Sequence, residues 1–190
     1  PFAGRAAGVF AQTMTHEKIL SFDEAPQVLA KLRGEKKIVQ CHGTFDLLHP
    51  GHVMHLQQAK TLGDVLVVTV TSEKFVKKGP GRPFFDDVMR QNSLAALQCV
   101  DYVVVIPFAA AVEAIACVQP HTYCKGEEYE NARNDVTGNI HDDVKTVEKY
   151  GGKVIYVGSQ VASSTRLLNQ HFDLHPKGVK SFCQKLSAQH

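Results

Sequence analysis

The sequence predicts an α/β protein of the Rossmann-like class, with an open, mostly parallel five-stranded sheet and helices on both faces. Short runs rich in β-branched residues alternate with segments of helical periodicity along most of the chain. This β-α-β-α alternation is typical of a parallel sheet whose right-handed crossovers place helices on both of its faces. The chain has 190 residues, of which 44% are apolar, so it can bury one core and has little room for a second domain.

Five segments are expected to form the strands. The first covers residues 37–41. Residues 65–70 form a near-continuous β-branched run of the kind that parallel sheets bury on both faces. Three more segments of this character are residues 102–106, 121–125 and 154–157.

Helical segments occupy the intervals between the strands. Ser21 and Glu24 form a capping-box pattern, which predicts a helix that runs to about Arg33 and stops at Gly34. Four more helices are expected at residues 51–62, 86–98, 109–118 and 140–150. Ligands of such sheets bind beyond the carboxyl ends of the strands, so we expect function in the strand-to-helix loops.

The chain is expected to contain one catalytic domain and two terminal extensions. The domain covers residues 18–170. Residues 1–17 are rich in Ala and Gly and are interpreted as an N-terminal extension, which is a cloning remnant, a processed end or a targeting segment. Residues 171–190 are expected to form a helical tail or a connector.

Charge and cysteine content exclude several classes of partner. The formal net charge is +2, so neither nucleic acid nor an anionic membrane surface is indicated, and any anion site must be local. No apolar run approaches the roughly 18 residues that span a bilayer. The five cysteines form no C-x-x-C pair, which favours reduced, buried thiols in a cytoplasmic protein.

The segment from His42 to His52 follows the first strand and enters a helix, so it should lie at the ligand-binding edge. Gly43 lets a ligand approach the backbone, and Pro50 is tolerated at a helix start. The free N–H groups at that helix start favour a phosphate. His49 and His52 are three residues apart, so both imidazoles can face the same group.

These features suit nucleotidyl transfer, which needs no enzyme nucleophile because the acceptor is itself a phosphate oxygen. Positioning and charge stabilisation then supply the catalysis. An alternative is a zinc cluster, which would belong to a metal-dependent hydrolase and would use the histidines at positions 42, 49, 52 and 55. It is disfavoured because no acidic residue or Cys at helical spacing completes the ligand set.

Residues 43–52, Gly-Thr-Phe-Asp-Leu-Leu-His-Pro-Gly-His, resemble the signature of the cytidylyltransferase-like family of nucleotidyltransferases. The chain is most similar to the nucleotidyltransferase domain of ADP-heptose synthases and their sugar-kinase-fused relatives. Further matching segments are residues 59–64, 78–83, 100–103, Lys125-Gly126 with Tyr129, and 163–166. The sequence departs from the family pattern at His42, where Asn or Tyr is common, and at Glu128, where Asp is expected.

The resemblance implies a role for each matching residue. His49 and His52 are the expected transition-state donors, and Arg90 is expected near the acceptor phosphate. Lys78 lies on a Gly/Pro-rich flap, residues 77–83, and is expected to reach the phosphates. These four residues are the catalytic candidates. The resemblance assigns no metal ligand, and Asp46 is the best nearby carboxylate. The expected nucleotide-binding residues are Gly43, Thr44, Phe45, Asp46, Gly51, Lys77, Lys125, Gly126, Ser164, Thr165 and Arg166.

The implied activity is transfer of AMP or CMP from ATP or CTP to the phosphate of a sugar or polyol phosphate, with release of pyrophosphate. Mg²⁺ is the expected cofactor, bound with the triphosphate. The resemblance also implies a homodimer and, in a longer protein, fusion to a ribokinase-like kinase domain. A catalytically silent nucleotide-binding module that regulates such a kinase is the alternative.

Overall fold

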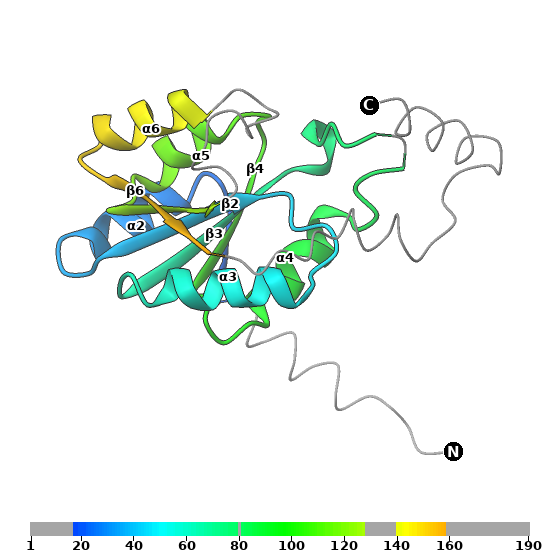
Figure 1. Cartoon of the computed structure of the whole chain (residues 1–190), viewed down its shortest axis with the longest axis horizontal. Helices are drawn as coiled ribbons and strands as arrows, with labels where there is room; N and C mark the ends of the chain where they lie inside the picture. Colours follow the sequence, from blue (N-terminus) through cyan, green and yellow to red (C-terminus); the bar gives the residue numbers. More distant parts are fainter. Residues whose placement is uncertain (1–16, 80, 128–139, 159–190) are drawn as a thin grey trace, which may run out of the picture.

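A computed structural model describes residues 17–79, 81–127 and 140–158 of the chain. Its centre is a six-stranded sheet in the order β1-β4-β3-β2-β5-β6, in which every neighbouring pair of strands is parallel (Figure 1). The strands are β1 (Ile19–Leu20), β2 (Ile38–Gly43), β3 (Val65–Thr71), β4 (Tyr102–Ile106), β5 (Thr122–Gly126) and β6 (Lys153–Val157). The Rossmann-like fold class predicted from the sequence is therefore confirmed.

The sheet has one strand more than the five predicted. The additional strand, β1, has two residues and pairs with β4 at the edge of the sheet, where Ile19 lies opposite Val103. The Val103 amide also donates to the Lys18 carbonyl oxygen at 2.8 Å. Two residues carry no hydrophobic period, so only the pairing partner reveals this strand.

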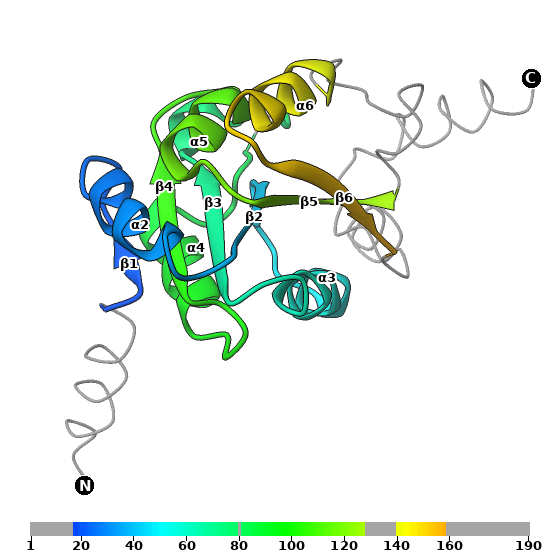
Figure 2. The same cartoon turned by 90° about the vertical axis from the view of Figure 1, so that its left-hand side faces the viewer.

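The helices cover both faces of the sheet, as Figure 2 shows. One face packs against α2 (Ala25–Arg33) and α5 (Ala111–Val118), and α6 (Ile140–Lys149) packs beside α5. The opposite face packs against α3 (Pro50–Lys60) and α4 (Asp87–Ala95). A short 3-10 helix, η1 (Glu73–Phe75), follows β3.

The predicted capping box forms before α2. The Glu24 amide donates to Ser21 Oγ at 3.2 Å, and the Ser21 amide donates to Glu24 Oε2 at 3.0 Å. These reciprocal bonds satisfy N–H groups that the first helical turn leaves unpaired. The regular helix begins at Ala25 and ends at Arg33, next to Gly34.

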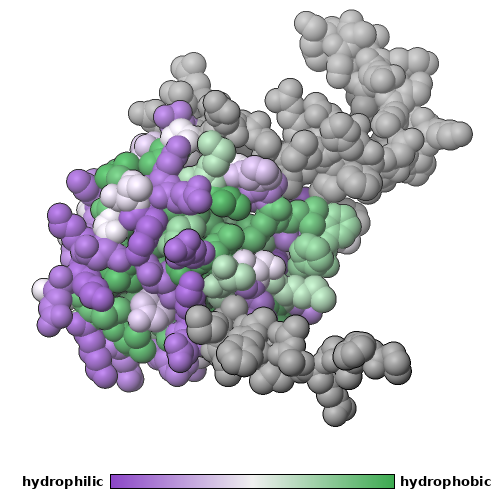
Figure 3. All heavy atoms as spheres, turned by 90° about the horizontal axis from the view of Figure 1, so that it is seen from below, coloured by the Kyte–Doolittle hydropathy of each residue, from purple (hydrophilic) through white to green (hydrophobic). Residues whose placement is uncertain are grey.

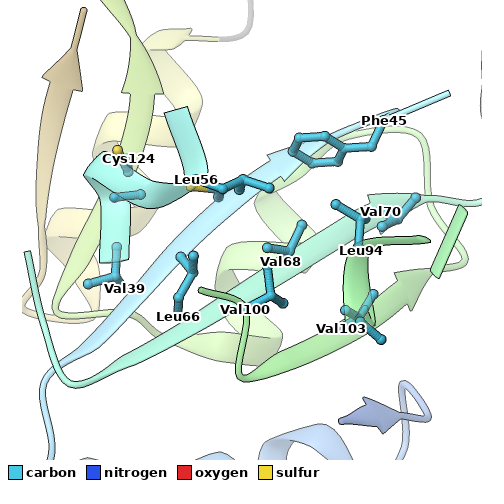
Figure 4. Close-up of a cluster of buried hydrophobic side chains, with 13 residues drawn as sticks. Val39, Phe45, Leu56, Leu66, Val68, Val70, Leu94, Val100, Val103 and Cys124 are labelled. Carbon is cyan, nitrogen blue, oxygen red and sulfur yellow. The ribbon is translucent and has the colours of Figure 1, made fainter. Parts of the chain in front are cut away.

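The core consists of two apolar layers separated by the sheet. All seven residues of β3 are buried, which agrees with its prediction as a strand covered on both faces. The layer beneath α3 and α4 includes Leu56 and Leu94, packed on Val68 (Figure 4). The layer on the other face includes Leu29 of α2 and Val118 of α5.

Strand β2 lies between β3 and β5, at the point where the order of the strands reverses. The connection through α3 leads to β3 on one side, whereas β5 pairs with the other side of β2. Loops that leave adjacent strands in opposite directions open a crevice at the carboxyl edge, and this is where ligands of such sheets bind. The loop from β2 to α3 therefore lies at the predicted ligand edge.

Within the described ranges, no helix has the length and apolar character needed to cross a bilayer.

Gly63 provides a test of packing at the turn before β3. A Cβ at this position would lie 2.7 Å from both the Lys37 carbonyl oxygen and Val39 Cγ2, so backbone or core must shift. We expect Gly63→Ala to lower the free energy of unfolding by about 1–3 kcal/mol, measured by urea denaturation.

Gly34→Ala is the matched control, because Gly34 has helical dihedrals and its Cβ would meet nothing within 4 Å. It should be neutral or stabilising by up to about 1 kcal/mol. Equal losses in the two variants would contradict this account of the Gly63 turn.

Candidate nucleotide-binding site

The loop between β2 and α3 is held by a buried aromatic ring. Phe45 has a left-handed backbone, with φ of 46°, and is 7% exposed. Its ring meets the His52 imidazole edge-on, with 5.5 Å between the ring centroids. A Cβ on Gly43 would lie 3.1 Å from Phe45 Cε2, so the small residue at the end of β2 lets this ring fold back. The loop thus delivers the chain to α3 in a fixed orientation.

His49 and His52 stack at the start of α3. His49 is the N-cap residue, with extended dihedrals, and Pro50 follows in the first helical turn. The two imidazole centroids are 3.9 Å apart. The Nδ1 atom of each ring is buried and has no hydrogen-bond partner among the described residues. The predicted pair of donors therefore lies on one side of the helix start, and each ring has a nitrogen that no described residue engages.

Both histidines are neutral near pH 7. Burial lowers the pKa of His52 to about 4, assisted by the neighbouring charges of His49, Lys78 and His55. Burial also lowers the pKa of His49. A neutral imidazole has one N–H donor and one acceptor nitrogen, so each ring can still donate one hydrogen bond to an anion.

Lys78 brings a cation towards this pair from the loop after η1. Its charge contributes to the lowered pKa of His52, which places the two groups within electrostatic range. Burial, followed by the charges of Arg82 and Arg90, lowers the pKa of Lys78, and Asp46 opposes this effect. Such crowding of cations is relieved when an anion binds between them. Lys78 and its neighbour Lys77 are both exposed side chains, so the desolvation of Lys78 is partial.

Asp46 fixes the end of the flap to the loop. Its Oδ1 accepts hydrogen bonds from the amides of Phe84 and Phe85, at 2.8 and 3.0 Å. Its Oδ2 lies 3.3 Å from Arg82 Nη1. The carboxylate considered as a magnesium ligand thus has one oxygen engaged by two N–H groups, while Oδ2 faces the Arg82 guanidinium without a hydrogen bond to it.

Arg90 lies beneath the site rather than in it. The residue is 1% exposed, and its Nη1 donates to the carbonyl oxygens of Thr44 and Thr71, at 2.6 and 2.9 Å. Its Nη2 pairs with Asp87 at 2.5 Å. In this arrangement the guanidinium ties the β2 loop to β3 and α4, whereas the expected role was a contact to an acceptor phosphate. Sequence position alone could not separate these two roles.

Lys125 points away from α3. Its neighbour Cys124 packs beneath α3, and side chains alternate along a strand, so Lys125 reaches the opposite face. There its Nζ pairs with the buried Asp143 of α6 at 3.0 Å. Gly126 is the last residue of β5. The expected site residues Ser164, Thr165 and Arg166, together with Glu128, lie outside the described residues.

A polar ladder that sequence reasoning did not identify crosses β2 and β3. His42 Nδ1 lies 3.0 Å from Thr69 Oγ1, and His42 Nε2 lies 3.2 Å from Thr71 Oγ1. Gln40 Nε2 donates to the same Thr69 hydroxyl at 3.0 Å. Burial, with a smaller contribution from Lys125, lowers the pKa of His42 to about 3. The sequence feature that could have indicated this ladder is the pair of threonines, Thr69 and Thr71, in the otherwise apolar run of β3, at positions that share one face of the strand.

The four histidines do not gather into a zinc cluster, since His42 bonds to β3 while His49 and His52 stack on each other. In the part of the chain that the structure describes, one group of His, Cys, Asp or Glu side chains has ligand atoms close enough to share a metal. It contains Cys41, His55 and Cys124.

An apolar groove of about 460 Å³ runs beside His49. Figure 3 views the molecule from the side of α3 and shows apolar side chains at the surface. The groove residues are Leu48, His49, Pro50, Val53, Met54 and Leu97.

The low pKa of His42 predicts acid sensitivity. Its folded-state pKa of about 3 is below the unfolded value of 6.5, so the unfolded chain binds more protons as pH falls below 6.5. This group should cost about 2 kcal/mol of stability between about pH 7 and pH 5. His42→Asn should remove that part of the pH dependence in urea denaturation, whereas His141→Asn, at an exposed position on α6, should retain it. Parallel pH profiles for wild type and His42→Asn would refute the assignment.

Known proteins share extensive sequence similarity with this chain. The cytidylyltransferase-like family matches residues 40–186. Bifunctional protein HldE of Pelobacter propionicus is 43% identical over 137 residues, which cover 71% of this chain and 26% of that protein. Bifunctional protein HldE of Helicobacter pylori strain J99 is 36% identical over 156 residues, which cover 81% and 28%. The chain thus spans little more than a quarter of the length of these relatives.

A solved structure gives the same result for the fold. The lipopolysaccharide core biosynthesis protein from Thermoplasma volcanium superimposes with a TM-score of 0.54 at 25% identity. The match covers 67% of this chain and 99% of that one. With the family match extending over well more than half of its residues, this chain belongs to the cytidylyltransferase-like family of nucleotidyltransferases.

Proposed function

We propose that this chain transfers a nucleotidyl group from ATP or CTP to the phosphate of a sugar or polyol phosphate and releases pyrophosphate. The observation that carries the proposal is the stacked pair His49 and His52 at the start of α3, within electrostatic range of Lys78. The pair lies at the carboxyl edge of β2, where the order of the strands reverses. Imidazole donors, a helix start and a cation together favour a bound triphosphate.

In the proposed reaction, an oxygen of the acceptor phosphate attacks the α-phosphorus of the triphosphate in line. A bond forms between that oxygen and the α-phosphorus, and the bond from the α-phosphorus to the bridging oxygen breaks, so that pyrophosphate leaves with the electron pair. His49 and His52 donate hydrogen bonds to phosphate oxygens as charge develops on them, and Lys78 neutralises the leaving group. No side chain has to act as a nucleophile.

The buried polar contacts support this role by fixing the loop before the ligand arrives. Arg90 holds the Thr44 carbonyl, and Asp46 holds the amides of Phe84 and Phe85. A donor that is already in place pays no reorganisation cost when charge develops. We therefore propose Arg90 as a positioning residue rather than a contact to the acceptor.

Magnesium is proposed to bind with the triphosphate, where it would supply charge neutralisation on the phosphate oxygens. Asp46 is an unsuitable ligand because its Oδ1 already accepts two amides and its Oδ2 faces the Arg82 guanidinium. Phosphate oxygens and water would then complete its coordination. The remaining predicted contacts to the nucleotide are Lys77, Lys125, Gly126 and, outside the described residues, Ser164, Thr165 and Arg166.

An adenylyl donor and a sugar phosphate acceptor are favoured over a cytidylyl donor and a polyol phosphate. The chain resembles the nucleotidyltransferase domain of ADP-heptose synthases, and its structural relative from Thermoplasma volcanium is a lipopolysaccharide core biosynthesis protein. We accordingly propose a heptose phosphate as the acceptor. The matched relatives are bifunctional and far longer, which supports the proposal that the chain is fused to a kinase domain in a longer protein. A homodimer is proposed from the family resemblance alone.

Substitution of the histidine pair tests the transfer reaction. We expect His49→Ala and His52→Ala each to lower kcat by about 10²–10³-fold, the cost of losing one charge-stabilising donor. The measurement is pyrophosphate release with ATP or CTP, crossed with heptose, glycerol and ribitol phosphates. Lys74→Ala, on exposed η1, is the control and should retain wild-type turnover. Tight triphosphate binding without turnover on any acceptor would instead favour a silent regulatory module.

Triphosphate binding should be coupled to proton uptake. The pKa values of His49 and His52 are low in the free protein, and an anion beside the rings favours their charged form. Affinity should therefore rise as pH falls from about 7.5 to about 6, and calorimetry in buffers of different ionisation enthalpy should report proton uptake. His52→Ala should reduce the uptake, whereas His141→Ala should not. A pH-independent affinity would contradict the proposed protonation of the pair on triphosphate binding.

A further inference from the structure

Two cysteines and a histidine from three different elements meet beneath α3. Cys41 of β2 and Cys124 of β5 are register partners on adjacent parallel strands. Both pack in the apolar layer that contains Leu56 and Ala59 of α3, and Figure 4 shows Cys124 beside Leu56. His55 of α3 completes the group, and one ligand atom from each residue lies within 4.8 Å of the other two.

These distances suit a small, thiophilic cation. Zinc binds sulfur at about 2.3 Å and imidazole nitrogen at about 2.0–2.1 Å, so its ligand atoms lie roughly 3.5–4 Å from one another. The observed group is therefore within a small movement of a zinc geometry. Cys41 and Cys124 are free thiols that are 1% and 2% exposed, whereas His55 is half-buried, so the position borders solvent on its imidazole side.

The apolar surroundings select the charge of the cation. Two thiolates and a neutral imidazole carry a charge of −2, which one divalent cation cancels, and an uncompensated charge in an apolar layer is costly. Monovalent copper would leave one negative charge, and magnesium or calcium requires oxygen ligands. Zinc is the common divalent cation that accepts sulfur and nitrogen donors at such distances.

We propose that Cys41, Cys124 and His55 bind one Zn²⁺ ion through both Sγ atoms and one imidazole nitrogen, with a water molecule as the fourth ligand. Each thiol gives up its proton as its bond to zinc forms, so two protons leave per ion bound. The ion would fasten α3 to β2 and β5 beneath the nucleotide crevice, one helical turn from His52. This site does not depend on the proposed reaction, because none of its three ligands is a proposed phosphate contact.

The state of the thiols sets the pH dependence of this site. A thiol binds zinc as the thiolate, so each cysteine loses its proton when its bond to the metal forms. Zinc must displace protons, and its affinity should therefore increase with pH.

Metal titration of the full chain, stripped beforehand with a chelator, tests the proposal. We expect about one Zn²⁺ per chain in competition with a chromophoric chelator, and thiolate-to-metal charge-transfer absorption when Co²⁺ is used instead. Cys41→Ser, Cys124→Ser and His55→Gln should each weaken Zn²⁺ binding by at least about 100-fold, more than the loss of a second-shell partner costs. The charge-transfer band should weaken in both serine variants.

Two controls separate this site from other zinc positions. Cys117→Ser removes another buried thiol, which lies on the opposite face of the sheet, and it should leave Zn²⁺ binding unchanged. The double variant His49→Ala, His52→Ala should also bind Zn²⁺ normally, even though we expect it to lose transfer activity. Failure of the proposed reaction would therefore not be mistaken for failure of the zinc site.

Circular dichroism shows whether each variant folds. A second measurement, on the wild type, tests the zinc site without any variant. In partly denaturing urea, Zn²⁺ should slow alkylation of Cys41 and Cys124, but not of Cys117, as resolved by mass spectrometry of peptides. The proposal is overturned if no stoichiometric Zn²⁺ binds, if stoichiometric copper binds in its place, if the serine variants keep the ion, or if all three thiols are protected equally.

Discussion

The position of β2 between β3 and β5 is the constraint on which the rest of the structure depends. Because the chain passes to β3 on one side and β5 pairs on the other, the carboxyl end of β2 lies where the strand order reverses, which is where such sheets bind ligands. The loop that leaves this end carries Phe45 in a left-handed conformation and begins α3 with His49. The end of β2 therefore determines where the stacked histidines, the cations near them and the groove beside α3 lie.

The alternation of side chains along β2 gives its two faces different chemistry. Gln40 and His42 turn towards the threonine hydroxyls of β3 and form a buried polar ladder. Cys41 turns the other way and meets the thiol of Cys124 beneath α3. A single strand thus supports a polar network on one face and a pair of soft ligands on the other, a consequence of its period of two.

Rigidity in the site comes from charged groups that are buried for structural reasons. Arg90 is enclosed and satisfies two backbone carbonyls and a carboxylate, while Asp46 receives two amides from the end of the flap. Removing one partner of such a group leaves a charge uncompensated, so these contacts are costly to break. They fix the position of the β2 loop relative to the flap. The histidines are held by packing of their rings against each other and against Phe45.

The sequence by itself determined the alternating elements, the position of the loop from His42 to His52 and the family signature within it, because hydrophobic period and local spacing are written along the chain. It did not determine β1, since a two-residue strand exists only through its pairing with β4. Tertiary structure alone decided that Arg90 is enclosed and that Lys125 pairs with Asp143. It also brought Cys41, His55 and Cys124 together, because strand register joins residues whose separation along the chain carries no signal.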